Sequence, residues 1–143
     1  MSIRHLALVG LASLALSGTA LAGNTAVVVQ NGGFNSSSIA QVGRTNTAVT
    51  VQTGIVNSAS TSQVGRFNSA ATAQVGRVNS AFTDQRGLVN SSSTLQFGRN
   101  NTAVATQRGL INGATIEQHG RNNAAGVGQT GLFNGANISQ SRR

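Results

Sequence analysis

The sequence QVGRFNSAATAQ at residues 63–74 decides the fold, because the chain repeats its pattern without insertion from residue 24 to residue 140. Glutamine recurs every 11 residues, and asparagine precedes each glutamine by six residues. Glycine follows each of the first ten glutamines by two residues. Strict repetition of a short unit predicts stacked structure, in which each unit packs on its neighbours, rather than a globular domain.

Three residue types keep this 11-residue period, and we expect them to be structural. The glutamines, predicted to form one ladder of stacked amides, are Gln30, Gln41, Gln52, Gln63, Gln74, Gln85, Gln96, Gln107, Gln118, Gln129 and Gln140. The asparagines, predicted to form a second ladder, are Asn24, Asn35, Asn46, Asn57, Asn68, Asn79, Asn90, Asn101, Asn112, Asn123 and Asn134. The glycines, predicted to make the turns, are Gly32, Gly43, Gly54, Gly65, Gly76, Gly87, Gly98, Gly109, Gly120 and Gly131.

The repeat favours strands over helices. An 11-residue period also suits a right-handed helical supercoil, but each glycine in such a helix would cost about 1 kcal/mol. In the strand interpretation, Asn, a small Ala or Ser, a Val, Ile, Thr or Ala, and Gln occupy alternate positions of each unit. Alternate residues share one face of a strand. We therefore expect this constant face to be interior and the variable residues between to face solvent.

The four residues between each Gln and the next Asn are predicted to form a turn. Its fixed glycine supplies a position where φ > 0 is accessible or where backbones approach closely. Two strand-turn units then make one 22-residue rung with two facing strands, and rungs stack at about 4.8 Å. The predicted fold is all-β, a cross-β, amyloid-like β-solenoid in which Asn and Gln side chains form ladders along the stack.

Residues 1–22 predict a secretory signal peptide. Arg4 precedes an apolar run over residues 6–16, and the small-residue sequence Ala20-Leu21-Ala22 provides a cleavage site. The alternative is a membrane anchor. The Ser, Gly and Thr residues in this segment argue against it, because they make the apolar run weak for a stable membrane span. The predicted organisation is a signal peptide over 1–22 and a repeat domain over 23–143, with eleven units between residues 24 and 140. The protein is therefore expected to be secreted.

Composition limits how such a chain can be stabilised and what it attracts. The nine arginines after residue 22 outnumber the two acids, Asp84 and Glu117, so this region carries a formal charge of +7, and such a chain attracts anionic polymers. Cysteine is absent, which removes disulfides, and proline is absent, which removes a common means of blocking edge strands. The first and last units keep the motif, so both ends should present unpaired edges that template open-ended growth.

The pattern Q-x-G-x-x-N-x-[A/S]-x3-Q, as at residues 63–74, resembles the curlin repeat of bacterial curli subunits. The resemblance implies a functional amyloid: a subunit exported unfolded through a dedicated outer-membrane pore and assembled, with itself and with other curlin-type subunits, into extracellular cell-surface fibres for biofilm and adhesion. Two features depart from the usual pattern. The repeats start at Asn24 without an intervening export segment, and every unit begins with Asn, which is closer to the minor, nucleating subunit than to the major one.

The variable positions show a second pattern, with a period of 22 residues. Arg77, Arg99 and Arg121 follow glycine in alternate turns and are predicted to line a basic edge, while Leu88, Leu110 and Leu132 line the other. In the N-terminal half the phase slips, since Arg44 and Arg66 belong to the Leu edge and Ile55 to the Arg edge. The arginines either keep fibres soluble or attach them without sequence preference to DNA or anionic polysaccharide. The apolar edge is either turn packing or a surface for bundling and adhesion.

Enzyme activity, a cofactor and a small-molecule substrate are not expected. After residue 22 the chain has one His, one Asp, one Glu and no Cys, which is too few for a metal site or an acid–base pair. Asp84 and Glu117 are expected to be solvent-facing charges that slow premature aggregation.

Two monomeric alternatives remain open. One is an ice-binding β-solenoid displaying the threonine row of residues 50, 61, 72, 83 and 94. This row, however, shares the interior face of the ladders. The other is a surface adhesin, for which capping sequences would be expected at the ends.

Overall fold

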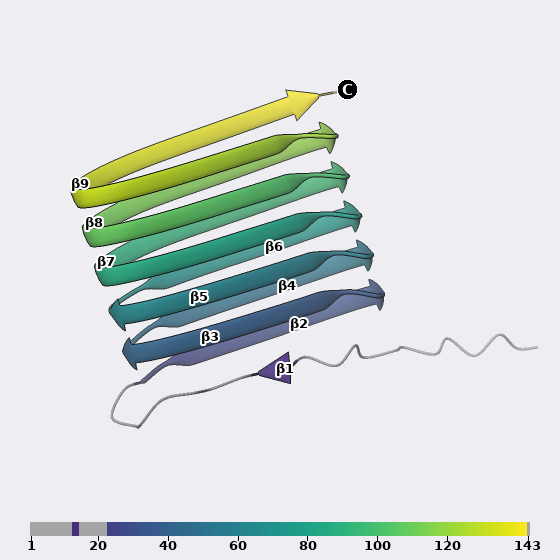
Figure 1. The fold of residues 1–143 in the computed structure, drawn as a ribbon. Coiled ribbons are helices and arrows are strands. Elements are labelled where there is room, and N and C mark those ends of the chain that lie inside the picture. Colours follow the sequence, from purple (N-terminus) through teal and green to yellow (C-terminus); the bar gives the residue numbers. More distant parts are fainter. Residues whose placement is uncertain (1–12, 15–22, 143) are drawn as a thin grey trace, which may run out of the picture.

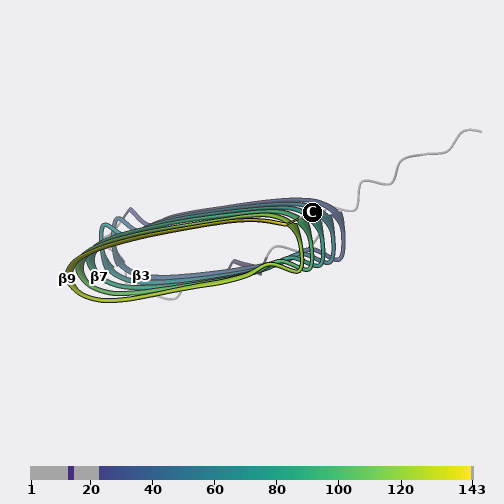
Figure 2. The same ribbon diagram turned by 90° about the horizontal axis from the view of Figure 1, so that it is seen from above.

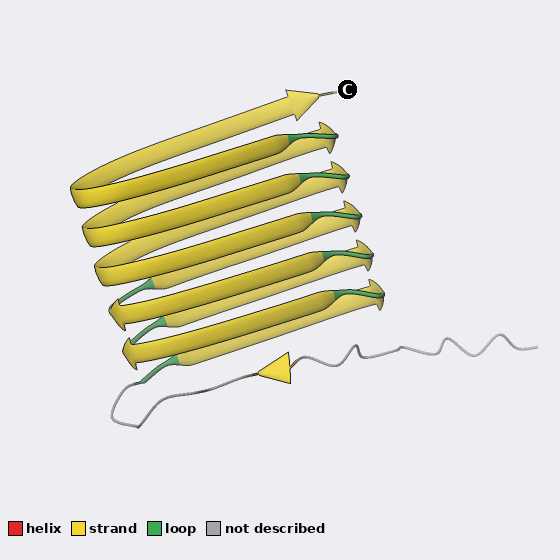
Figure 3. Cartoon of the chain, viewed as in Figure 1, coloured by secondary structure: helices red, strands yellow, loops and turns green. Residues whose placement is uncertain are grey.

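The computed structural model describes residues 13–14 and 23–142, and its architecture is a parallel β-solenoid (Figure 1). Seen along the stack, each rung is a flattened loop with two long sides (Figure 2). The described residues are almost entirely strand (Figure 3). The predicted all-β class is thus confirmed. The strands are β1 Ser13–Leu14, β2 Thr25–Gly33, β3 Ser36–Arg44, β4 Thr47–Ile55, β5 Ser58–Arg66, β6 Ser69–Arg77, β7 Ser80–Arg99, β8 Thr102–Arg121 and β9 Ala124–Arg142.

The paired residues of strands β2 to β9 lie 22 positions apart in parallel register, so the predicted 22-residue rung is confirmed. We call each strand-forming half of a rung an arm. One side of the solenoid is formed by arms 25–33, 47–55, 69–77, 91–99, 113–121 and 135–142. The facing side is formed by arms 36–44, 58–66, 80–87, 102–109 and 124–131.

The constant face of every arm points inward. In the inner rungs its Asn, Ala or Ser, branched and Gln positions are buried, whereas the same positions are only half-buried in the first arm, 24–30, and the last, 134–140. The apolar part of the core is thin, built from alanines with a few larger residues such as Ile39, Ile116 and Val127. The core therefore depends heavily on its amides, and the end rungs are less well covered than the middle.

The turn glycines are required by both conformation and space. All ten have positive φ, between 106° and 140°. A Cβ added to Gly87 would lie 1.7 Å from the carbonyl oxygen of Gly109, and the other inner turn glycines meet the same obstacle. The backbone of each turn thus rests directly on the next, and only glycine permits that approach.

The turns between the arms are themselves part of the stack. Strand pairing continues through the glycine in every rung, because turn residues also stack on their counterparts 22 positions away. Two kinds of bend occur. Seven contain a residue with φ between 52° and 59° just before Asn, whereas the bends at Leu88, Leu110 and Leu132 lie within continuous strands β7, β8 and β9. The latter bends all lie at one edge (Figure 3).

The predicted signal peptide, residues 1–22, lies outside the described residues except for β1, whose Ser13 and Leu14 pair with Ser38 and Ile39 of β3. In the described part of the chain, no helix is long and apolar enough to cross a membrane.

We predict that Gly87→Ala destabilises the solenoid strongly. The alanine would need a backbone conformation that costs about 1–3 kcal/mol for a residue other than glycine, and its Cβ would overlap the Gly109 carbonyl. Gly113→Ala is the matched control, since Gly113 has open space around its Cβ position and no positive φ. The urea midpoint of the far-ultraviolet circular dichroism signal measures the effect, and equal midpoints for the two variants would contradict the steric argument.

Candidate functional site

The glutamine side chains form two continuous ladders inside the solenoid, one on each side. The Nε2 of each glutamine donates to the Oε1 of the glutamine 22 residues later, at 2.6 to 3.0 Å. The inner glutamines are buried, so water cannot replace these bonds. Each rung is thereby fixed to the next by an interior bond as well as by its backbone.

The second amide hydrogen of the glutamine crosses the core. Gln41 Nε2 donates to the carbonyl oxygen of Thr25 at 3.0 Å, and Gln85 Nε2 donates to that of Ser69 at 2.9 Å. The same bond, to the carbonyl 16 residues earlier, is made by Gln63, Gln74, Gln96, Gln107, Gln118 and Gln129. Each of these eight glutamines therefore links its own strand to a neighbouring strand on its own side of the solenoid and to a strand of the facing side.

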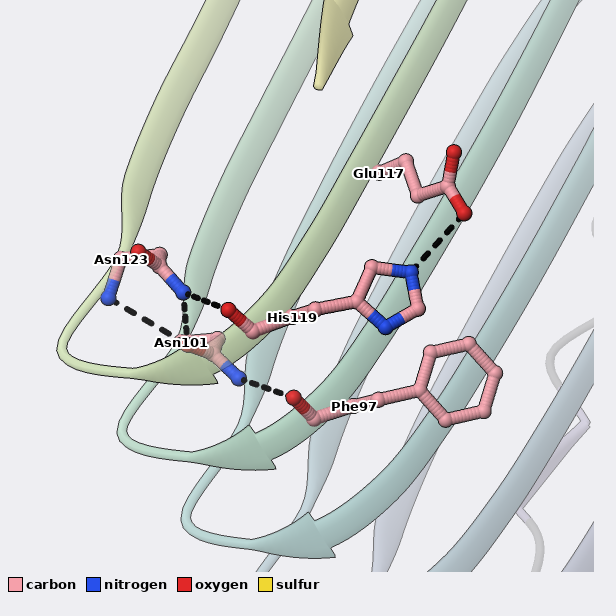
Figure 4. A network of polar contacts seen from close by, with 5 residues as sticks. All are labelled: Phe97, Asn101, Glu117, His119 and Asn123. Carbon is pink, nitrogen blue, oxygen red and sulfur yellow. Dashed lines mark hydrogen bonds and ion pairs between the residues drawn. The ribbon is translucent and has the colours of Figure 1, made fainter. Parts of the chain in front are cut away.

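The asparagines stack in the opposite direction and also close the turns. Asn123 Nδ2 donates to Asn101 Oδ1, 22 residues earlier, at 3.2 Å, and the backbone N–H of Asn123 reaches the same oxygen at 3.3 Å (Figure 4). Asn123 Nδ2 also donates to the His119 carbonyl, as Asn101 Nδ2 does to that of Phe97. These side chains replace the backbone hydrogen bonds that the bend cannot make.

The direction of the glutamine ladders makes the two ends of the stack different. At the N-terminal end, Gln30 Oε1 and Gln41 Oε1 are buried and have no hydrogen-bond partner. At the C-terminal end, Gln129 and Gln140 are the last of their ladders, and their Nε2 groups have no glutamine above them. In the glutamine ladders, the N-terminal end thus presents amide acceptors and the C-terminal end presents amide donors.

The outermost strands also present unpaired backbone groups. The arms 124–131 and 135–142 pair only with the rung before them, and β2 pairs only with β4. In inner rungs the residue after Asn donates its N–H to the next rung, as Thr102 does to Asn123 O at 2.8 Å. Along a strand the backbone N–H groups of successive residues point alternately to the two neighbouring strands. The N–H groups of Gly135, Asn137 and Ser139 therefore point toward the open C-terminal end.

The residues predicted to line the basic edge stand in one column. Arg77 pairs with Arg99 and Arg99 with Arg121, and all three side chains are exposed. Ile55 precedes them in this column, and Arg44 pairs with Arg66 at the other edge, where the leucines follow. The column of Arg44 and Arg66 therefore lies at one edge, and the column of Arg77, Arg99 and Arg121 lies at the other.

The prediction for Asp84 was wrong: its side chain is not solvent-facing. Asp84 is 6% exposed, although it lies on the outer face. Arg86 Nη2 lies 3.4 Å from its Oδ2 and Arg108 Nη2, from the next rung, lies 4.0 Å away. The two arginines cover the carboxylate, so this acid partly neutralises a stacked arginine pair.

Glu117 and His119 form an ion pair or hydrogen bond on the outer face, with Glu117 Oε1 2.8 Å from His119 Nε2 (Figure 4). The His119 ring stacks on Phe97 of the rung below, with centroids 5.0 Å apart. Among the described residues, no three acids, histidines or cysteines gather as a metal site. The threonine row proposed for ice binding is buried, so it offers no outward surface.

These features define a class of protein: a cross-β solenoid held by amide ladders, with unpaired strand edges at both ends. Residues 112–141 match the family model of the curlin associated repeat. The resemblance to the curlin repeat is thereby confirmed, and the units before residue 112 keep the same Asn, Gln and Gly spacing. Comparison with curated proteins finds no match.

Gln85→Leu is expected to destabilise the inner stack far more than Gln30→Leu. The inner change leaves Gln107 Nε2 unaffected but removes the bond that Gln63 Nε2 donates to Gln85, the bond that Gln85 donates to Gln107 Oε1 and its bond to the Ser69 carbonyl. Each buried group left unsatisfied costs about 1–3 kcal/mol. Gln30 is half-buried and bonds to only one glutamine, Gln52. Urea unfolding of the two soluble variants measures the difference. A Gln30→Leu variant as destabilised as Gln85→Leu would show that the ladder contributes little.

Proposed function

We propose that this protein is a secreted structural subunit that polymerises end to end into extracellular curli-type amyloid fibres, which serve the biofilm matrix and adhesion. One observation carries the proposal: the two ends of the stack are complementary. The N-terminal end offers orphaned, buried glutamine oxygens, and the C-terminal end offers glutamine amide donors in the same ladder positions. A second copy is the partner that matches every position at once.

Head-to-tail stacking would continue both ladders and the parallel backbone pairing without a break. The interior positions of the end arms are half-buried in the single chain, so a second copy would cover them as the inner rungs are covered. Long, flat strand edges without proline or bulges favour such addition. Polymerisation would thus give the described end rungs the hydrogen-bond partners and the burial that the inner rungs already have.

Secretion, the cell-surface location and the export pore enter this proposal through the predicted signal peptide of residues 1–22 and through the curlin repeat. The same ends suit both the bulk subunit of a fibre and the nucleating subunit. A seeding assay against other curlin-type chains separates the two roles, because a nucleator accelerates a slower partner at substoichiometric amounts.

The chain of residues 23–143 is expected to form fibres on its own. It carries every pair from β2 to β9, and its rungs should give a meridional reflection at about 4.8 Å. Fibre diffraction and thioflavin fluorescence of the purified chain provide the measurement. A protein that stays monomeric and lacks this reflection would overturn the proposed function.

Asn137→Pro should abolish fibre growth while leaving the monomer folded. The N–H that proline removes faces the open end of β9, and proline is tolerated on edge strands where the lost N–H was unpaired. Asn137→Ala is the control and should polymerise normally. Light scattering during incubation and circular dichroism of the monomer test this prediction, which fails if the proline variant elongates at the wild-type rate.

The arginine column supports a second proposal, non-specific attachment of the fibre to DNA or acidic polysaccharide. Stacked guanidinium groups present a regular row of charge to a polyanion. The chain has no Trp or Tyr and only five Phe for stacking on bases.

A triple Arg77, Arg99 and Arg121 to Ser variant should bind duplex DNA less tightly and with a shallower salt dependence, because three phosphate contacts are lost. Fibre formation should be unchanged, since all three side chains are exposed. Co-sedimentation of fibres with labelled DNA at several salt concentrations measures both. If the variant fibres bind DNA as tightly as wild-type fibres, the arginine column serves solubility and not attachment.

A further inference from the structure

The ends of the stack are stepped, because each arm makes only half a rung. At the C-terminal end, arm 135–142 stands half a rung above arm 124–131 on the facing side (Figure 1). At the N-terminal end, β2 lies half a rung below β3. A second copy can therefore dock in two ways: with β2 over arm 135–142, or turned by half a turn with β2 over arm 124–131.

We propose that successive copies are turned by half a turn about the fibre axis, so that residue i of one copy stacks on residue i + 99 of the copy before it. This inference rests on the proposed end-to-end polymerisation and fixes its geometry. In this junction β2 meets arm 124–131 and β3 meets arm 135–142 of the previous copy, and the two steps interlock. Without the half turn, β2 over arm 135–142 holds β3 away from arm 124–131 and leaves a strand-wide gap.

The orphaned amides match the turned junction. Gln129 Nε2 would donate to Gln30 Oε1 of the next copy, and Gln140 Nε2 would donate to Gln41 Oε1, as i and i + 22 do within the chain. Both unpartnered oxygens at the N-terminal end are satisfied. Docking without the half turn serves Gln30 alone, because Gln41 then faces the gap.

The exposed phenylalanines provide a second, independent match. Phe34 is 87% exposed and Phe133 is 72% exposed, the two highest values among the exposed large hydrophobic residues. They lie 99 residues apart, so the turned junction stacks one directly on the other. The two kinds of bend that meet here already adjoin within the chain, where the left-handed bend at Phe67 lies beside the extended bend at Val89.

The turned junction also removes the phase slip in the edge residues. Along one edge of the fibre, the residue after each turn glycine is then Arg77, Arg99 and Arg121 before the junction and Arg44 and Arg66 of the next copy after it, so the arginines gather in a single block. Along the opposite edge, the second residue after each turn glycine is Val89, Ile111 and Phe133 before the junction and Phe34, Val56 and Val78 of the next copy after it. These residues form a single apolar block. Without the half turn, both blocks are cut at every junction.

Each edge of such a fibre alternates between basic and apolar blocks, and the two edges are identical but displaced by one subunit. Eleven arms at half a rung each give a subunit rise of about 26 Å, from a rung spacing of about 4.8 Å. The arginine block becomes complete only on assembly. Because β1 pairs with β3 on the edge used here, the junction requires a chain without residues 1–22.

Thiol cross-linking in the chain of residues 23–143 tests the geometry, since the protein has no cysteine of its own. Val29→Cys fibres are grown as equimolar mixtures with either Gly128→Cys or Ser139→Cys, and a short bis-maleimide is added. All three positions face outward. The turned junction places position 29 beside position 128, and the unturned one places it beside position 139.

We expect a strong heterodimer band for Val29→Cys with Gly128→Cys, and at least a tenfold weaker one for Val29→Cys with Ser139→Cys. The reverse ratio, or equal bands, in mixtures that form normal fibres would overturn the half turn while leaving polymerisation intact. Image reconstruction of wild-type fibres gives the second readout: alternation of the phenylalanine-bearing edge every ~26 Å supports the proposal, and a constant edge contradicts it. Absence of fibres would count against the proposed function itself.

Discussion

The glutamine side chain is the interaction on which the rest of this solenoid depends. Its amide accepts a bond from the rung before, donates one to the rung after, and donates another across the core to the facing strand. A hydrophobic residue in this position could pack, but it could not fix register, because apolar contacts are not directional. The amide admits one stacking position, and the 11-residue period of the sequence follows from that requirement.

Because the interior is polar, a single rung is not stable by itself and is stabilised by the rungs stacked on it. Alanines and a few larger residues bury little apolar surface per rung, so each rung is held mainly by bonds to its neighbours. Buried amides stabilise when every partner is present and destabilise when one is missing. The inner rungs meet this condition, and the end rungs do not, as the orphaned oxygens of Gln30 and Gln41 show. The ends therefore differ from the middle in free energy although they share its sequence.

Much of this fold could be predicted from spacing alone. The two-residue alternation within units assigns the inner and outer faces, and the doubling of the period follows from the need to bury the constant face of each strand. The direction of the ladders could not be predicted, because an amide has no preferred direction until its backbone is placed. The bond from Gln85 to the Ser69 carbonyl depends on the width of the core. The burial of Asp84 depends on Arg108, which enters its surroundings only when the rungs stack.

The same stacking that satisfies the interior amides concentrates charge on the surface. Arginines in register stand one rung apart, and two unit charges about 4.8 Å apart repel each other by about 1 kcal/mol even at the dielectric constant of water. Asp84 relieves this repulsion between Arg86 and Arg108, but within the described residues no acid lies beside Arg77, Arg99 and Arg121. A polyanion bound along that column would relieve it in the same way. Linkage then requires reciprocity: a polyanion that binds the stacked arginines more tightly than the separated ones must favour assembly by the same free energy. If the fibre attaches to an anionic matrix as proposed, polyanion binding and stacking of the arginines would therefore favour each other.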